Sequence, residues 1–186
     1  LTRLHNELIN KDWFMTLIDV EDYIKTKDRM FKDFEDRDSW MKKVLITGGN
    51  KGIGLETTKL FLEAGYKVIV VARDFKDFPY KNHENIQTIE FDVNKVQEIA
   101  VIKNIVGTVD VLVNNAGIMY SLPYDDYPEE NKERLMNVNL YAPIEFITQF
   151  SKLMIENGGG RIVNVASVAG QIGHPDVWYG VSKAGI

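Results

Sequence analysis

The stretch TGGNKGIGLE, residues 47–56, directly follows the apolar run KVLI and has four glycines among its first eight residues. An apolar run, a glycine-rich turn and then apolar residues at helical spacing predict a strand, a tight turn and a helix. Glycine loses more conformational entropy on folding than any other residue, so this concentration requires a positive φ or a close approach of the backbone to another group. A phosphate at the exposed amides of the helix N-terminus is the group that fits best.

The same alternation of apolar runs and amphipathic stretches continues through the rest of the chain. The segment 129–156 has apolar residues near one helical face, and it predicts the longest helix. Strands are predicted at 43–47, 67–72, 86–91, 109–114 and 161–166. Strands that alternate with helices indicate βαβ units, so we expect an α/β fold, a Rossmann-type doubly wound parallel sheet that is incomplete at the C-terminus.

Residues 1–40 have a different composition, rich in charged and aromatic side chains. Their apolar spacing predicts a helical extension or linker, and we expect residues 41–186 to form the dinucleotide-binding domain. The string TLIDVEDYI at 16–24 resembles the start of the last helix of an acyl carrier protein, although no carrier-type DSL serine precedes it. An ordinary packing or linker helix is the alternative.

Composition and charge argue against several classes of protein. The apolar runs are much shorter than the roughly 20 residues that span a bilayer, so we expect a cytoplasmic protein without membrane partners. The chain has no cysteine, and its three histidines lack ligand spacing, so we expect no metal site. A net charge of −5 argues against nucleic-acid binding. Because the chain starts with leucine and ends in what looks like an interrupted helix, we expect it to be a fragment.

The spacing of Gly48, Gly52 and Gly54 differs from the dinucleotide fingerprint G-x-G-x-x-G but serves the same mechanics. The glycine turn is followed in order by NNAG at 114–117 and YGVSK at 179–183. With these three motifs, residues 41–186 resemble the short-chain dehydrogenase/reductase family. An ordinary Asn-Gly turn is the alternative for NNAG taken alone. The resemblance implies cofactor binding by Gly48, Asn50, Lys51, Gly52, Ile53, Gly54, Asn114, Asn115, Ala116 and Gly117.

The pair Tyr179 and Lys183 suits acid–base chemistry. Residues four apart share a helix face, and a cation beside a phenol favours the phenolate, which makes the phenol a usable acid. In the family, the tyrosine gives its proton to a carbonyl oxygen as hydride arrives, and the lysine also holds the nicotinamide ribose. The resemblance therefore implies that both residues act in catalysis and contact the cofactor.

Two further catalytic residues follow from the resemblance. The family serine ends the fifth strand, and RIVNVASVAG at 161–170 supplies Ser167, which is one residue nearer the tyrosine than in many members. Ala166 stands at the usual spacing, but alanine cannot donate a hydrogen bond, so we assign Ser167. The asparagine that anchors a proton-relay water best matches Asn139, with Asn137 or a purely structural amide as alternatives.

Charge near the second predicted strand argues for NADP rather than NAD. Ala72 occupies the position of the acid that binds the ribose hydroxyls in NAD-type members, and Arg73 follows it. Lys51 adds a second cation. In FDV at 91–93, Asp92 resembles the family's acceptor for the adenine amine and Val93 packs on the ring; a helix-cap aspartate and a core valine are the alternatives.

Together these features predict an NADP(H)-dependent oxidoreductase that acts on a carbonyl or alcohol substrate. A carrier-bound 3-oxoacyl thioester is favoured if 16–24 is carrier-like, and otherwise a sugar, a steroid or a small ketone remains open. A non-catalytic dinucleotide-binding or regulatory module is the alternative from a different class, and residues 1–40 could serve as a docking arm. We expect the complete protein to be a homo-oligomer.

Overall fold

The structure is a computed structural model, and it describes residues 41–186. The predictions made for residues 1–40, including the carrier-like string at 16–24, lie outside the described residues. None of the helices in the described part is long and apolar enough to cross a membrane.

Five parallel strands form one sheet with the order β3-β2-β1-β4-β5. The direction of strand succession reverses between β1 and β4, which makes the carboxyl ends of these strands a topological switch point. The prediction of a doubly wound parallel sheet is therefore confirmed. The strands are β1 (Lys43–Thr47), β2 (Lys67–Ala72), β3 (Ile86–Glu90), β4 (Val111–Asn114) and β5 (Arg161–Asn164).

Three of these strands are shorter than the sequence predicted. β3 ends at Glu90 because its neighbour β2 ends at Ala72, and β5 ends at Asn164 beside the last residue of β4. β4 begins at Val111 rather than at residue 109. A ladder continues only while both strands remain extended, so each shortening follows from where the neighbouring strand or loop turns away.

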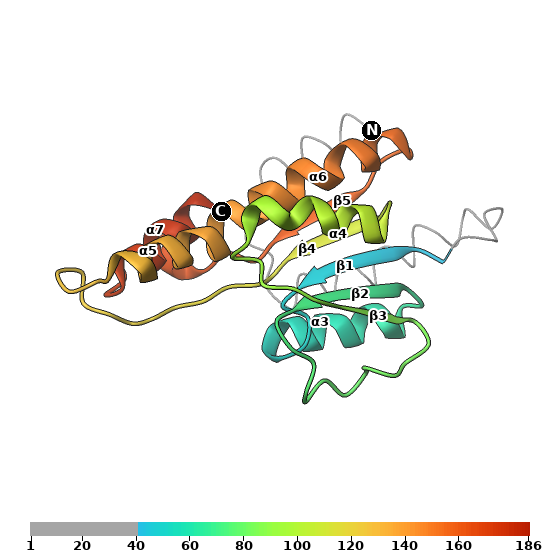
Figure 1. The fold of residues 1–186 in the computed structure, drawn as a ribbon, viewed down its shortest axis with the longest axis horizontal. Coiled ribbons are helices and arrows are strands. Elements are labelled where there is room, and N and C mark those ends of the chain that lie inside the picture. The colour runs from blue at the N-terminus through green and yellow to red at the C-terminus, as the bar shows by residue number, and fades with distance from the viewer. Residues whose placement is uncertain (1–40) are drawn as a thin grey trace.

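Helices cover both faces of the sheet, α3 (Gly52–Glu63) on one face and α4 (Ile99–Val106) with α6 (Ala142–Glu156) on the other (Figure 1). Successive strand residues point to opposite faces, so Val44 packs in the core under α3 and Leu45 in the core under α4 and α6. Burial on both faces explains why the strands read as continuous apolar runs.

The predicted long helix over 129–156 contains an irregular turn that the sequence did not indicate. It consists of α5 (Glu129–Met136), the π-helical turn η2 (Asn137–Tyr141) and α6. The Ala142 N–H bonds to the carbonyl of Asn137, five residues earlier. Single π-turns inside α-helices frequently occur at functional sites.

Three short or terminal elements complete the described fold. The 3₁₀ turn η1 (Val96–Glu98) leads into α4. A second 3₁₀ turn, η3 (Val168–Gly170), follows β5 and packs against the last helix, α7 (Val177–Gly185). Helix α7 also packs against α5 and the π-turn, so the end of the chain lies beside the helix that follows β4.

Candidate active site

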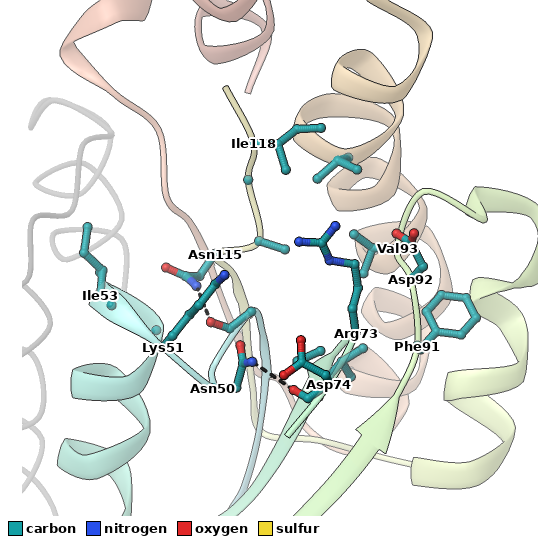
Figure 2. A pocket seen from close by; sticks show the side chains of 18 of the residues that line it. Asn50, Lys51, Ile53, Arg73, Asp74, Phe91, Asp92, Val93, Asn115 and Ile118 are labelled. Atoms are coloured by element: carbon teal, nitrogen blue, oxygen red, sulfur yellow. Dashed lines mark hydrogen bonds between the residues drawn. The ribbon is translucent and has the colours of Figure 1, made fainter. Parts of the chain in front are cut away.

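A cleft of about 380 Å³ lies at the carboxyl ends of the strands (Figure 2). Its walls come from the segments that follow β1, β2, β3 and β4, together with Arg134 and Val138 from the long helix. Of the predicted cofactor residues, Asn114, Tyr179 and Lys183 are not part of its lining. Those that line it are Gly48, Asn50, Lys51, Gly52, Ile53, Gly54, Arg73, Asp92, Val93, Asn115, Ala116 and Gly117.

The glycine turn has little room for side chains. Gly48 and Gly52 have φ values of +67° and +54°, which favour glycine. A Cβ on Gly54 would overlap the carbonyl oxygen of Gly48, and a Cβ on Gly48 would lie 3.1 Å from Cα of Ala116. The turn therefore packs directly against NNAG and contributes backbone, without side chains at its glycines, to the floor of the cleft.

Helix α3 starts at this turn without a protein cap. Lys51 occupies the N-cap position with no side-chain hydrogen bond to the helix, and the first turn contains no acidic residue. The first amides of a helix lack intrahelical acceptors and lie at the positive end of its dipole. The site therefore fits an anionic group such as a pyrophosphate.

The Thr47 side chain joins the glycine turn to NNAG. Its hydroxyl accepts the backbone N–H groups of Asn115 and Ala116, each at 3.0 Å. The side chain of Asn115 in turn donates to the carbonyls of Thr47 and Gly48 at 3.0 and 3.1 Å. No sequence motif indicates this role for Thr47, although a polar residue at the end of an apolar strand is a usable signal.

The end of β2 presents one cation, Arg73, to the cleft. Ala72 is buried at the strand end, whereas Arg73 and Asp74 are exposed. Arg73 points from the strand toward Val93 (Figure 2). Asn50 donates to the Asp74 carbonyl at 2.9 Å, so this loop is tied to the glycine turn.

On the opposite side of the cleft, Asp92 is held by two partners. Nη2 of Arg134 donates to its Oδ2 at 2.7 Å, and the N–H of Asn94 donates to its Oδ1 at 3.0 Å. Partial burial would raise the pKa of Asp92, but the two hydrogen bonds and the charges of Arg134 and Arg73 outweigh burial and lower it. No sequence spacing pointed to Arg134, which lies 42 residues from its partner.

Asn139 is buried in the π-turn with every part of its amide bonded. Its Oδ1 accepts the N–H of Ile118 at 2.8 Å, and its Nδ2 donates to the Ile118 carbonyl at 2.9 Å and to the Ser182 hydroxyl at 3.0 Å. The alternative, Asn137, bonds Asn94 at 3.3 Å. Asn139 therefore joins the segment after β4 to helix α7.

Lys183 lies beside Asn139 and Gly117. A Cβ on Gly117 would be 3.4 Å from Nζ of Lys183 and 3.5 Å from Oδ1 of Asn139. Nζ donates to the Val165 carbonyl at 2.8 Å, and burial lowers the pKa of Lys183 to about 8. Nζ lies 6.0 Å from the centre of the Tyr179 ring, one helical turn earlier.

Ser167 lies on the turn that packs against α7. Its hydroxyl accepts the N–H of Ala169 at 3.2 Å and thereby caps η3. A Cβ on Gly170 would come within 2.6 Å of the Lys183 carbonyl group, so the turn lies directly against the helix backbone. Among residues 41–186, no hydrogen bond joins the Ser167 hydroxyl to Tyr179.

Asn114 has a place in the sheet rather than in the cleft lining. It is 3% exposed, and its Nδ2 donates to Oδ1 of Asn164 at 2.9 Å. These residues are register partners at the ends of β4 and β5. The side chain therefore joins the two strands at the first residue of NNAG.

Comparison with known proteins assigns this arrangement to a family. The family described as short chain dehydrogenase matches residues 42–186. The chain belongs to the short-chain dehydrogenase family. Both the predicted family and the predicted fold are thus confirmed.

Curated relatives are about one third identical to the chain over the aligned residues. The ketoacyl reductase HetN of Nostoc sp. is 31% identical over 78% of this chain and 54% of the relative. The NAD-dependent glycerol dehydrogenase of Listeria innocua is 34% identical over 83% of this chain and 63% of the relative. The chain thus spans less than two thirds of the length of these relatives.

Solved structures of related proteins have the same fold. One from Streptomyces avermitilis has a TM-score of 0.74 at 28% identity, over 80% of this chain and 57% of that one. A 4-hydroxyisoleucine dehydrogenase complexed with NADH scores 0.73 at 28% identity, over 77% and 62% of the two chains. ElxO with NADP bound scores 0.71 at 31% identity, over 78% and 64%.

A short similarity of another kind is also present. Over 52 residues the chain is 60% identical to maltodextrin phosphorylase of Streptococcus pneumoniae. These 52 residues are 28% of this chain and 7% of the phosphorylase. A match to so small a part of the phosphorylase supports no conclusion about the activity of this chain.

Proposed function

We propose that the chain binds NADP(H) in the cleft and belongs to an oxidoreductase that moves hydride between nicotinamide and a carbonyl or alcohol substrate. The observation that carries this proposal is the glycine turn, where Gly54 leaves no room for a Cβ and helix α3 begins without a side-chain cap. Related structures with NADH or NADP bound support a nicotinamide dinucleotide as the ligand.

The preference for NADP rests on Lys51 and Arg73, which line the cleft and are exposed. An arginine and a lysine suit a 2′-phosphate, whereas Ala72 offers no carboxylate to the ribose hydroxyls. Replacing Arg73 by alanine should weaken NADPH binding about tenfold and leave NADH binding unchanged, because only NADPH carries that phosphate. Equal losses for both dinucleotides would contradict the preference, and Lys76→Ala on the same loop is the matched control.

In the proposed reaction the dinucleotide supplies or accepts the hydride. The Tyr179 phenol gives its proton to the substrate oxygen in the reductive direction and removes it in the oxidative direction. The Ser167 hydroxyl donates to the same oxygen, and the Lys183 ammonium favours the phenolate that remains. Asn139 holds the segment after β4 against α7 and anchors the water through which the proton is replaced. Tyr179 and Lys183 also contact the nicotinamide ribose, and Asn114 supports this end of the site through the sheet.

For the substrate we propose a 3-oxoacyl thioester, which the similarity to a ketoacyl reductase supports. Similarity to a glycerol dehydrogenase and to a galactitol 2-dehydrogenase supports a polyol as the alternative. A cofactor-binding module without catalysis is the alternative from another class.

The test measures nicotinamide absorbance with an acetoacetyl thioester and, separately, with glycerol and galactitol. We expect thioester reduction by NADPH and a loss of at least about 100-fold in kcat for Tyr179→Phe, with NADPH binding retained. Unchanged turnover in Tyr179→Phe would overturn the catalytic assignment. NADPH binding without turnover on any of these substrates would favour the binding module.

A further inference from the structure

Arg134 is a charged residue of the cleft that no sequence motif indicated. It comes from helix α5, and its Nη2 lies 2.7 Å from Oδ2 of Asp92, in the loop after β3. The side chains of Arg134 and Asp92 are 32% and 28% exposed, and both residues line the cleft. The ion pair therefore forms part of the surface that a bound dinucleotide would meet.

The pair has a fixed geometry. Oδ1 of Asp92 accepts the N–H of Asn94 at 3.0 Å, so both carboxylate oxygens are held, one by the backbone and one by Arg134. A second bond, from Nδ2 of Asn137 to Oδ1 of Asn94 at 3.3 Å, joins the same loop to the π-turn that directly follows α5. A carboxylate oxygen offers about two acceptor positions, so Asp92 keeps acceptor capacity for a ligand.

The charges explain why a guanidinium suits this position. An unpaired carboxylate beside a dinucleotide would repel its phosphates, whereas the charge of Arg134 offsets that of Asp92. Burial would raise the pKa of Asp92, but the hydrogen bonds from Arg134 and Asn94, together with the charges of Arg134 and Arg73, lower it. Asp92 therefore remains a fixed, ionised acceptor at neutral pH. Arg73 forms no ion pair among residues 41–186, so the two arginines of the cleft are held differently.

We infer that Arg134 is a positioning residue that sets the specificity of the site for the base of the dinucleotide. It holds the Asp92 carboxylate where it accepts a hydrogen bond from a base that carries an amino group. In that position the carboxylate disfavours a base that carries an oxo group. The inference rests on the proposed function and on the role that the family resemblance implies for Asp92, as the acceptor for the adenine amine. A carboxylate pairs with the 6-amino group of adenine, while the 6-oxo group of hypoxanthine places an acceptor against an acceptor. Without Arg134 only the Asn94 N–H holds the carboxylate, so its Oδ2 is no longer fixed and the discrimination between the two bases falls.

The test compares NADPH with its hypoxanthine analogue, reduced nicotinamide hypoxanthine dinucleotide phosphate, by titrating nicotinamide fluorescence on the full chain. Wild-type protein should bind NADPH about tenfold more tightly than the analogue, the size expected for one charge-assisted hydrogen bond. Arg134→Leu should reduce this preference to less than about threefold, and Arg134→Lys should restore most of it because an ammonium still pairs with the carboxylate.

Lys132→Leu is the matched control, since Lys132 lies on the same helix and pairs with Glu129, which is 85% exposed in its side chain. It should keep the wild-type preference. The inference is overturned if Arg134→Leu keeps the wild-type preference, or if its affinities for NADPH and for the analogue fall by the same factor. Arg134 would then have a structural role only. If wild-type protein binds neither dinucleotide, the proposed function itself fails. If it binds both equally, the role of Asp92 in base selection fails while the cofactor assignment stands.

Discussion

At the scale of single residues, Gly54 has the strictest requirement in the cleft. A Cβ there would overlap the Gly48 carbonyl and lie 2.5 Å from Nδ2 of Asn115, both of which belong to the packed floor of the site. Gly54→Ala should therefore lower the free energy of unfolding by about 1–3 kcal/mol, because the backbone must shift to fit the methyl group. It should also weaken NADPH binding at least about tenfold.

Chemical denaturation and NADPH titration measure these two effects. Gly173→Ala is the control, because a Cβ on that loop glycine would meet no atom within 4 Å. Equal stability and affinity in wild type and Gly54→Ala would show that the turn is not the close contact described here.

Lys183 gives a prediction about pH. Burial lowers the pKa of Lys183 from 10.5 to about 8, so folded protein binds fewer protons than unfolded protein between these pH values. The contribution of Lys183 to stability is therefore least favourable below pH 8 and improves as pH rises to 10.5, by about 3 kcal/mol in total.

Lys183→Met removes the titrating group but keeps a long side chain, so it isolates this contribution. The free energy of unfolding of wild type minus that of Lys183→Met should rise from pH 7.5 to pH 10.5, measured by urea denaturation. A difference that stays constant across this range would contradict the buried ammonium.

At the scale of elements, the π-turn in the long helix places Asn139 between two other segments. The side chain bonds Ile118 twice and Ser182 once, and it is 1% exposed. Asn139→Ala leaves buried donors and acceptors without partners, and it should lower the free energy of unfolding by about 2–4 kcal/mol. The half-buried Asn137 makes one longer bond, so Asn137→Ala should cost less than about 1 kcal/mol. Equal losses in the two variants, measured by urea denaturation, would contradict the buried and fully bonded position of Asn139.

The elements also show how far sequence reasoning reaches. The strands and helices were predictable because apolar residues in runs or at helical spacing occupy the buried positions of these elements. The glycine turn was predictable because residues other than glycine rarely adopt its positive φ values. The π-turn was not, since NVNLY contains no glycine or proline to mark an irregular turn, and the irregularity accompanies tertiary bonds of Asn139. Arg134 likewise contacts Asp92 only after the chain brings α5 beside the loop following β3. Contacts of this kind depend on the fold and leave no local pattern.

At the scale of the whole molecule, the sheet order predicts a gradient of stability. β1 lies in the centre with neighbours on both sides, and its residues Val44, Leu45 and Ile46 are fully buried. β5 lies at an edge of the described sheet and exposes Ile162 by 37%. Amide hydrogen exchange should therefore be slowest in β1 and markedly faster in β5, because edge amides open without disrupting the centre. Equal protection in both strands would contradict this strand order.

The central claim, that the cleft at the switch point holds a nicotinamide dinucleotide, is tested most directly by amide hydrogen exchange of the full chain with and without NADP⁺. The account predicts slower exchange on binding in the four segments that line the cleft, while the loop at 157–160 stays unchanged. The segments are 48–54, 71–74, 91–93 and 115–118. Unchanged exchange in these segments at saturating NADP⁺, or protection confined to other parts of the chain, would contradict it.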